Sequence, residues 1–418
     1  MSGNVRQRKG DKSSNLKEFQ NENIETKQKK GTSFCPRLCL FLVTSTILMS
    51  VGLVIAALVL PSPITPRPYS LPSPPPKLEG PLAPNTRLQD ATRLFENEIL
   101  GPESIFVNKE YIYTGTADGR VVEIFKGKQR TLARLGNPPC GGPENEPHCG
   151  RPLGMKMDKD GYLIVADAYF GLFKVNVATG DFTVLYNSTS TPISSHFIRL
   201  MNDLDIHSDG TIYLSSSSSK FYRREFPYIM LEGQPEGGIY AFDPVTSHMT
   251  QLLGGLYFAN GVTLTKDGKY LLIVETVKCR ILKYHLSGIE SGKLEIFADN
   301  LPGVPDNIRR SSKGGYWVAM AAVRHQGMFN PVDFLAENPW FRNLIAKFIL
   351  KSLMTRFFSA ILPEYGLILE LDGQGKIVQS LHDPSGKVVP SVSEVEESGP
   401  FLYLGSYALP YFTKLLKK

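Results

Sequence analysis

Three asparagines stand at the same distance ahead of a turn glycine in separate stretches of the chain. Each lies eight residues before the glycine: Asn202 before Gly210, Asn260 before Gly268, and Asn307 before Gly315. Asp306 lies beside the third asparagine, and Glu103 precedes an apolar stretch of similar pattern. Amide and carboxylate oxygens are ligands that Ca²⁺ accepts in loose geometry. We therefore predict one Ca²⁺ held by these oxygens, provided that the fold brings the side chains together.

The elements that carry these residues repeat along the chain. The unit is an apolar strand, a turn rich in Gly, Asp or Lys, and a second apolar strand, and it recurs near residues 109, 160, 209, 267, 314 and 399. A period of about 40–50 residues with about four strands in each unit indicates a β-propeller blade. Six units predict an all-β fold, a six-bladed β-propeller over residues 87–418.

Equivalent positions of a propeller surround one central axis, so the predicted ligands form a ring at the mouth of the channel. A second interpretation stays open, in which the same polar side chains only make hydrogen bonds between neighbouring blades, because buried polar groups need partners in any case. Residues 93–100, ahead of the first unit, are expected to supply the outer strand that closes the ring.

The amino-terminal region has the pattern of a membrane anchor. Residues 1–37 contain nine Lys or Arg against four acids and are expected to be a disordered cytoplasmic tail. Residues 38–60 carry no charge and are long enough to span a bilayer. A cleaved signal peptide is the alternative. The positive-inside rule predicts a single-pass type II protein with its propeller lumenal or extracellular, at the plasma membrane or endoplasmic reticulum.

Two further segments lie outside the repeats. Residues 61–86, with ten prolines between 61 and 84, are expected to be a stiff stalk. Aromatic and aliphatic residues between 334 and 358 recur at helical spacing and predict a helical insertion in blade five. The helices either cap the propeller or form a lid that also touches lipid headgroups.

Two sequence features, a pair of cysteines and a glycosylation sequon, suit a compartment outside the cytosol. Cys140 and Cys149 bracket a short polar loop and are predicted to form a disulfide, with a zinc site that includes His148 as the rival. Cys279 is expected to be a buried free thiol. Asn187 begins an Asn-Ser-Thr sequon and is predicted to be glycosylated. Because the basic tail accounts for most of the net charge of +6, nothing indicates nucleic-acid binding.

Several longer motifs resemble one known family. They are Arg93-Leu94-Phe95-Glu96-Asn97, Val165-Ala166-Asp167-Ala168-Tyr169, Phe258-Ala259-Asn260-Gly261-Val262 and Pro305-Asp306-Asn307-Ile308-Arg309. In this order they resemble the strictosidine synthase-like branch of six-bladed propellers, whose wider superfamily includes paraoxonases and gluconolactonases. The resemblance implies a Ca²⁺ held in the channel by Glu103, Asn202, Asn260, Asp306 and Asn307.

Two departures from the related enzymes limit the expected chemistry. Ser393 stands where plant strictosidine synthases have an acid/base glutamate, and Glu394 is one residue away, on the opposite face of a strand. Asp167 stands near the position of a histidine that paraoxonases use. We therefore expect neither the condensation reaction nor a histidine-based lactonase.

The resemblance still implies weak hydrolysis of small aryl esters. Asp203 or Asp167 would deprotonate water, although a hydrogen bond beneath the metal ligands is the alternative role for Asp203. A non-catalytic interaction protein with a structural Ca²⁺ is the alternative function, for which the sequence identifies no partner. The serine run 215–219 lacks a Gly-x-Ser-x-Gly elbow, which argues against a serine hydrolase.

Overall fold

The computed structural model describes residues 36–193 and 197–417, and the chain divides into two units at residue 59. In the first unit, the helix α1 (Pro36–Val59) contains an apolar stretch, Leu38–Val59, that is long enough to cross a membrane. The predicted basic tail lies outside the described residues, except for its last two positions at the start of α1.

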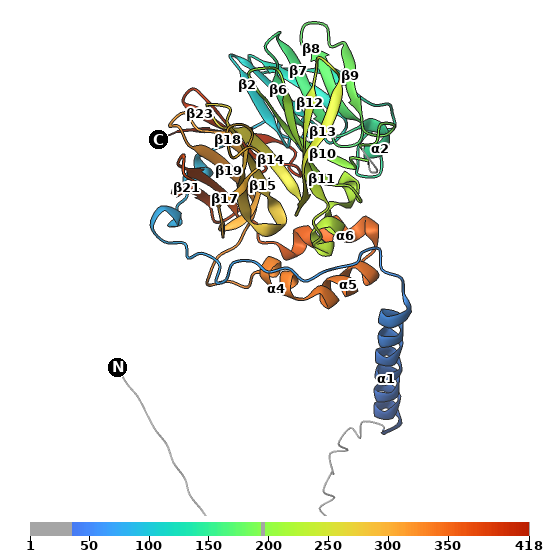
Figure 1. Ribbon diagram of the computed structural model, residues 1–418. Coiled ribbons are helices and arrows are strands. Elements are labelled where there is room, and N and C mark those ends of the chain that lie inside the picture. The colour runs from blue at the N-terminus through green and yellow to red at the C-terminus, as the bar shows by residue number, and fades with distance from the viewer. Residues whose placement is uncertain (1–35, 194–196, 418) are drawn as a thin grey trace, which may run out of the picture. The chain divides into compact units, whose positions relative to one another are not determined.

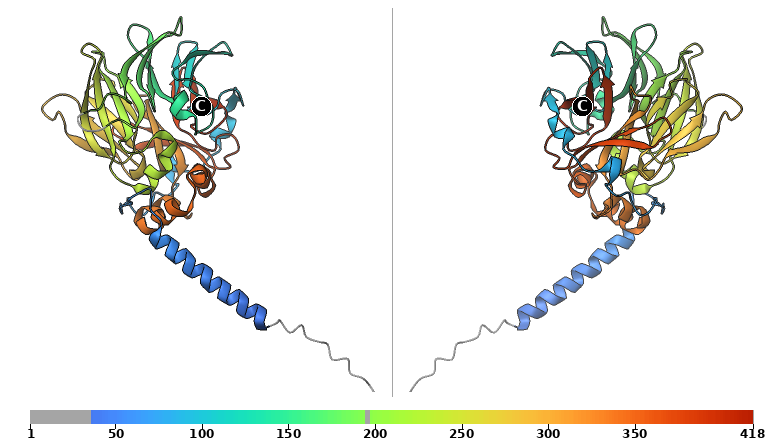
Figure 2. Two further views of the ribbon diagram at one scale, coloured as in Figure 1. Left: turned by 90° about the vertical axis from the view of Figure 1, so that its right-hand side faces the viewer. Right: turned by 90° about the vertical axis from the view of Figure 1, so that its left-hand side faces the viewer.

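The second unit is a propeller of six four-stranded sheets, as the repeats predict (Figures 1 and 2). The first blade is β2 (Ile105–Asn108), β3 (Tyr111–Gly115), β4 (Arg120–Phe125) and β5 (Lys128–Arg134). The second blade is β6 (Pro152–Met157), β7 (Tyr162–Asp167), β8 (Gly171–Asn176) and β9 (Phe182–Asn187). The third blade is β10 (Leu200–Ile206), β11 (Ile212–Ser218), β12 (Gly237–Asp243) and β13 (His248–Leu256). The fourth blade is β14 (Ala259–Leu264), β15 (Tyr270–Glu275), β16 (Arg280–His285) and β17 (Leu294–Ala298). The fifth is β18 (Gly303–Arg310), β19 (Tyr316–Val323), β20 (Gly366–Leu371) and β21 (Ile377–Asp383).

The sixth blade closes the ring with strands from both ends of the propeller. It contains β22 (Glu394–Ser398), β23 (Phe401–Gly405) and β24 (Phe412–Leu416), with β1 (Thr92–Leu94) as its outer strand. β1 pairs antiparallel to β24, with Leu94 opposite Phe412. An outer closing strand from this region is therefore confirmed, but it ends at Leu94, and residues 95–100 of the expected range lie outside it.

Four innermost strands share a β-bulge at one position. Pairing with the next strand is interrupted over two residues in β6, β10, β14 and β18, at 153–154, 202–203, 260–261 and 306–307. The first residue of each bulge lies eight positions before a turn glycine of positive φ: Leu153 before Gly161, Asn202 before Gly210, Asn260 before Gly268, and Asp306 before Gly314. Bulges redirect side chains and are common beside active sites.

This register corrects the one predicted for the fifth blade. The residue equivalent to Asn202 and Asn260 is Asp306, not Asn307. The difference arises because two glycines follow each other in that turn, and Gly314, with φ of 84°, takes the left-handed position that Gly315 was expected to occupy.

The proline-rich segment differs from the predicted free stalk. Ile64, Tyr69 and Leu71 are buried among propeller side chains, and Arg324 donates a hydrogen bond to the carbonyl of Pro72 at 2.6 Å. The segment runs past the helices α4 (Pro331–Glu337) and α5 (Pro339–Phe348) before the short helices η1 (Gly80–Leu82) and η2 (Arg87–Asp90) (Figure 1). The segment packs against the propeller because the apolar side chains between its prolines are buried there. The composition of the segment does not predict this packing.

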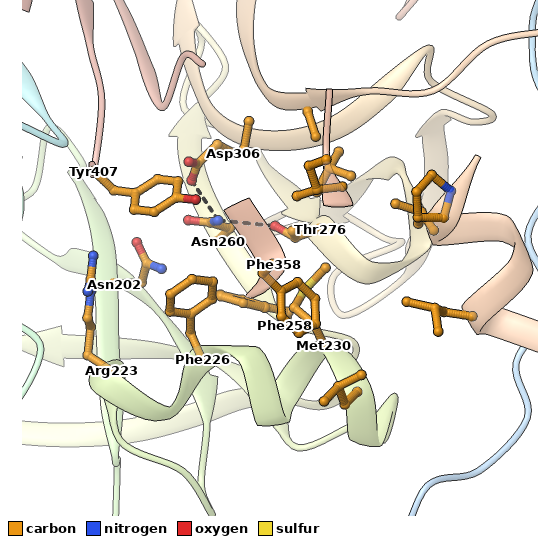
Figure 3. Close-up of a pocket in the computed structure, with 18 of the residues that line it drawn as sticks. Asn202, Arg223, Phe226, Met230, Phe258, Asn260, Thr276, Asp306, Phe358 and Tyr407 are labelled. Atoms are coloured by element: carbon orange, nitrogen blue, oxygen red, sulfur yellow. Dashed lines mark hydrogen bonds between the residues drawn. The ribbon is translucent and has the colours of Figure 1, made fainter. Parts of the chain in front are cut away.

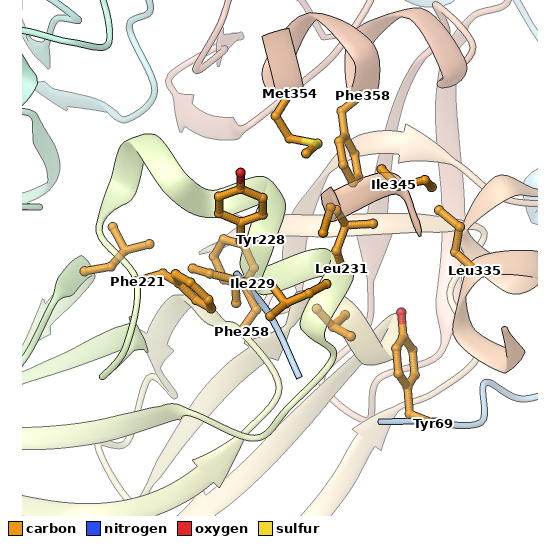
Figure 4. Packing of buried hydrophobic residues seen from close by; sticks show 14 of the residues in the cluster. Tyr69, Phe221, Tyr228, Ile229, Leu231, Phe258, Leu335, Ile345, Met354 and Phe358 are labelled. Carbon is orange, nitrogen blue, oxygen red and sulfur yellow. The ribbon is translucent and has the colours of Figure 1, made fainter. Parts of the chain in front are cut away.

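Helices gather at one end of the propeller. α4 (Pro331–Glu337), α5 (Pro339–Phe348) and α6 (Lys351–Ile361) lie between β19 and β20 of the fifth blade, and η3 (Arg223–Glu225) and α3 (Phe226–Glu232) lie between β11 and β12. Their inner sides share one apolar cluster with Tyr69 and Phe258 (Figure 4). Each large apolar side chain buried there contributes about 1.5–3 kcal/mol, so packing holds the helices over the channel end.

Cysteine pairing follows the sequence prediction. Cys140 and Cys149 form a disulfide around the short helix α2 (Glu146–Cys149), and Cys279, next to η4 (Thr276–Lys278), is a buried free thiol. The disulfide removes Cys140 and Cys149 from any zinc site with His148.

Candidate functional site

A cavity with a polar floor and apolar walls lies between the innermost strands and the helices (Figure 3). Its empty volume is about 1050 Å³, part of which is open to solvent. Four of the five predicted calcium ligands line it: Glu103, Asn202, Asn260 and Asp306. Leu153 occupies the equivalent bulge position of the second blade and lines the cavity too.

A hydroxyl group from the same blade orients the first amide. Asn202 Nδ2 donates to Ser217 Oγ at 2.9 Å, and Ser217 Oγ donates to the carbonyl of Ala259 at 2.8 Å. Ala259 directly precedes Asn260 in the next blade, so the chain of hydrogen bonds links two neighbouring ligand positions. This use of Ser217 explains one residue of the serine run without any role as a nucleophile.

The same arrangement recurs one blade further on. Asn260 Nδ2 donates to Thr276 Oγ1 at 3.1 Å, and Thr276 Oγ1 donates to the carbonyl of Pro305 at 2.8 Å. Asn260 Nδ2 also donates to Asp306 Oδ1 at 2.7 Å. With both amide hydrogens engaged, Asn260 Oδ1 remains buried without a hydrogen-bond partner. A buried acceptor without a partner is costly, and a cation would satisfy it.

Two buried carboxylates carry the negative charge of the floor. Burial raises the pKa of Glu103, and the pKa of Asp306 is raised well above its usual value by burial and by the charge of Glu103. Arg151 approaches Glu103 only to 3.8 Å. Two like charges close together in a buried site disfavour ionisation, and a divalent cation between them would restore it.

Asn307 occupies a different place from the other predicted ligands. It is the second residue of its bulge, equivalent to Asp203, and it is not among the residues that line the cavity. Its side chain is buried, and neither of its amide atoms has a hydrogen-bond partner. The oxygen is therefore available to a ligand, as that of Asn260 is.

Asp203 lies behind the floor in a buried ion pair. Its carboxylate accepts hydrogen bonds from Arg309 at 2.7 and 2.9 Å and from the backbone N–H of Val262 at 2.8 Å. Glu394 Oε2 lies 2.6 Å from the same arginine, and burial raises the pKa of Glu394 to about 8. Asp203 does not line the cavity.

Asp167 is fully buried away from the cavity floor. It accepts three backbone hydrogen bonds, from Arg151 at 2.7 Å, Tyr169 at 2.9 Å and Phe170 at 3.0 Å. Burial raises its pKa to about 6, although these three bonds act in the opposite direction. The contacts fix the turn after β7, and Asp167 does not line the cavity.

The structure shows the surroundings of Ser393, the residue expected at the position of the glutamate of plant strictosidine synthases. Ser393 precedes β22, and its side chain forms a hydrogen bond with Asp306. Its Oγ accepts the backbone N–H of Tyr407 at 3.0 Å. A carboxylate at this position would stand next to Asp306, and this chain has a neutral hydroxyl there instead.

Sequence reasoning missed the cationic and aromatic sides of the cavity. Arg223, from η3, lines the cavity and forms an ion pair of 3.2 Å with Glu146 of the disulfide loop. Tyr407, from the loop between β23 and β24, lines it as well (Figure 3). Both lie in loops without periodic pattern, so no sequence signal connected them with the ring.

Comparison with known proteins places the chain in a family. Models of strictosidine synthase and of the strictosidine synthase-like N-terminal region match residues 202–289 and 80–124. The adipocyte plasma membrane-associated proteins of Gallus gallus and Homo sapiens are each 43% identical over 391 residues, or 93% of this chain and 92% of each relative. The chain belongs to the adipocyte plasma membrane-associated protein family. The family name and α1 together fit a single-pass membrane protein.

A plant protein is similar in sequence, and two solved structures share the fold. Strictosidine synthase-like protein 10 of Arabidopsis thaliana is 36% identical, covering 74% of this chain and 84% of that protein. A gluconolactonase from Xanthomonas campestris superposes with a TM-score of 0.53 at 14% identity, covering 86% of this chain and 99% of that one. A calcium-binding regucalcin from Agrobacterium tumefaciens superposes with a TM-score of 0.51 at 14% identity, covering 77% of this chain and 92% of that one.

Proposed function

We propose that this protein is a membrane-anchored, calcium-binding propeller that hydrolyses simple aryl esters. The observation that carries the proposal is Asn260, whose amide hydrogens are both bonded while its buried oxygen has no partner. Glu103, Asn202, Asp306 and Asn307 would complete the ligand set. The calcium-binding regucalcin and the gluconolactonase of the same fold support a calcium-dependent hydrolase of this general class.

The walls of the cavity suit the apolar part of an ester. Phe226, Met230, Phe258 and Phe358 face the space above the polar floor (Figure 3). Aromatic and thioether side chains pack well against an aryl ring and exclude water around it. Arg223 is the cation available to a polar or anionic group on the substrate.

The chemical step needs a polarised carbonyl and an activated water. Bound Ca²⁺ would supply a Lewis acid that polarises the ester carbonyl and stabilises the oxyanion. Glu103 and Asp306 are the cavity-lining carboxylates within this floor that are available to accept a proton from water. The proposal gives Asp203 and Asp167 positioning roles, because neither reaches the cavity surface.

Hydrolysis of phenyl acetate by the full-length protein, with and without calcium chelation, tests this function. We expect hydrolysis that is lost on chelation at temperatures well below the unfolding midpoint. Asn260→Ala should abolish the calcium-dependent hydrolysis, whereas Asn176→Ala, at the partly buried end of β8 and outside the cavity, should leave it unchanged. No hydrolysis at all, with a midpoint that falls on chelation, would favour the non-catalytic interaction protein with a structural calcium.

The orientation in the membrane is part of the proposal. A disulfide at Cys140 and Cys149 suits an oxidising compartment, and Asn187 is exposed at the end of β9. We place the propeller on the lumenal or extracellular side, with Asn187 glycosylated and the tail 1–37 cytoplasmic. Glycosidase treatment should increase the gel mobility of the cell-expressed wild type but not of Asn187→Gln.

A further inference from the structure

The outer side of α4–α6 exposes large apolar side chains. Phe329, Trp340 and Leu350 are 69%, 61% and 67% exposed. Phe334, Phe348 and Leu353 are exposed as well. We call these six residues the cap patch. Six exposed large apolar side chains within 25 residues are more than ordinary surface and indicate a site of interaction.

The cap patch is distinct from the apolar core below the same helices. Ile345 of α5 and Met354 and Phe358 of α6 face inward and are buried (Figure 4). On the outer side, the Phe334 ring lies 5.7 Å from the Phe329 ring. These helices therefore carry exposed apolar side chains in addition to the buried ones, and core packing accounts only for the buried set.

The charge of α5 and α6 has one sign. Between Pro339 and Ile361 the sequence contains four basic residues and no acidic residue, whereas α4 contains Glu337 and Asp333, of which Asp333 pairs with Arg324. Arg342 is buried and bonded to backbone carbonyls, and Lys351 contacts Glu225. Arg356 is exposed beside the patch. Aromatic residues flanked by cations are the pattern of a helix that lies in the headgroup region of a bilayer.

The chain enters the propeller beside this same surface. The backbone N–H of Tyr69 bonds to the carbonyl of Ala336 in α4, and Arg342 bonds to the carbonyl of Arg67. Ile64 is already buried in the helical cluster. Only residues 60–63 separate it from Val59 at the end of α1, and the five Cα–Cα steps between Val59 and Ile64 span at most about 18 Å. A bilayer that contains α1 therefore lies within short reach of these helices.

We propose that the cap patch inserts into the headgroup region of the phospholipid bilayer that holds α1. The apolar and aromatic side chains contact the upper acyl chains, and the basic residues face the lipid phosphates. A bilayer explains the short connection, the aromatic content of the patch and the basic charge of α5 and α6 together. The inference does not depend on the proposed hydrolase activity.

The two tryptophans of the chain allow a direct test. Trp340 belongs to the cap patch, whereas Trp317 is buried and donates a hydrogen bond to Glu397. The full-length protein is reconstituted in phosphatidylcholine vesicles that contain a minority of phosphatidylserine and brominated phosphatidylcholine. We expect the bromine to quench Trp340, more strongly from positions near the headgroup than from the chain ends. Trp340→Phe, which leaves only Trp317, should lose this quenching.

Further variants separate insertion from other ways of covering the patch. Phe329→Ser with Leu350→Ser removes exposed side chains that make little contribution to folding, and it should reduce the quenching of Trp340. Two results would overturn the proposal. One is a Trp340 signal that acrylamide quenches freely in vesicles and bromine does not. The other is protection from both quenchers, which would mean that a protein surface covers the patch.

Discussion

Asp203 of β10 and Arg309 of β18 form a bidentate ion pair that links the third and fifth blades past β14. The two nitrogens of the guanidinium lie 2.7 and 2.9 Å from the two carboxylate oxygens. The intervening strand β14 also contacts the ion pair, because Val262 donates its backbone N–H to the same carboxylate at 2.8 Å. Three blades are thus held by one acidic side chain directly beneath the cavity floor.

Asp203→Asn should destabilise the propeller strongly. Removal of one partner from a buried ion pair costs about 3–5 kcal/mol, and we expect the lower end because Glu394 still faces Arg309. Asp205→Asn is the matched control, since Asp205 lies on the same strand and accepts the backbone N–H of Leu264 at 2.8 Å without an arginine. If chemical denaturation gave the same loss of unfolding free energy for both variants, that result would contradict a special role for the ion pair.

Stability should fall as the pH rises toward the pKa of Glu394. Its pKa of about 8 in the folded protein lies above that of an exposed glutamate, about 4.3, so the folded state holds the proton more tightly. The resulting stabilisation is complete below pH of about 4.3 and is lost as the pH rises through about 8. Between these two pH values, the thermal midpoint should fall less steeply with pH in Glu394→Gln than in the wild type. A steeper fall in the variant would exclude this assignment.

The hydroxyl groups behind the amides should control calcium affinity without touching the ion. Thr276→Val keeps the shape of the side chain but removes the acceptor that orients Asn260. Loss of such an outer partner weakens metal binding by about 10–100-fold. Thr263→Val, buried on β14 and outside the hydrogen-bond chain of the floor, is the control. Calcium titration by calorimetry should separate the two variants, and equal affinities would count against the orienting role.

The disulfide should influence the cavity through Glu146. This residue lies within the closed loop, accepts a hydrogen bond from Tyr169 at 2.8 Å and pairs with Arg223. Replacement of both Cys140 and Cys149 by serine should lower the free energy of unfolding by about 2–3 kcal/mol and raise the KM for phenyl acetate.

Glu146→Gln keeps the disulfide but weakens the ion pair with Arg223. It should raise the KM with a smaller loss of stability than the double cysteine variant. A KM unchanged in both variants would show that Arg223 is positioned by other contacts.

The sequence predicted the repeat and the gathering of four of the five candidate ligands at one cavity, because both depend on local spacing. Turn glycines and the asparagines eight residues before them identify equivalent positions without knowledge of the fold. The spacing failed where two glycines are adjacent, since only the backbone angle distinguishes Gly314 from Gly315. Ring closure by β1 was predictable for a similar reason, because a propeller requires an outer strand for its last sheet.

Interactions between distant segments could not be predicted from spacing. Arg309 reaches Asp203 across 106 residues of sequence, and Arg223 reaches Glu146 across 77. The proline-rich segment was expected to be extended, but its attachment depends on Arg324 and Arg342, which follow it by more than 250 residues. Such contacts depend on the assembled surface, which local composition does not describe.

The attachment of the proline-rich segment also determines how the propeller responds to mechanical force. A pull on the membrane anchor first meets the buried side chains of Ile64, Tyr69 and Leu71, and then η1 and η2 against β21. Only beyond them does the chain reach β1, the three-residue strand that closes the ring. These contacts therefore bear the tension before it reaches β1, and the strand that closes the ring is loaded last.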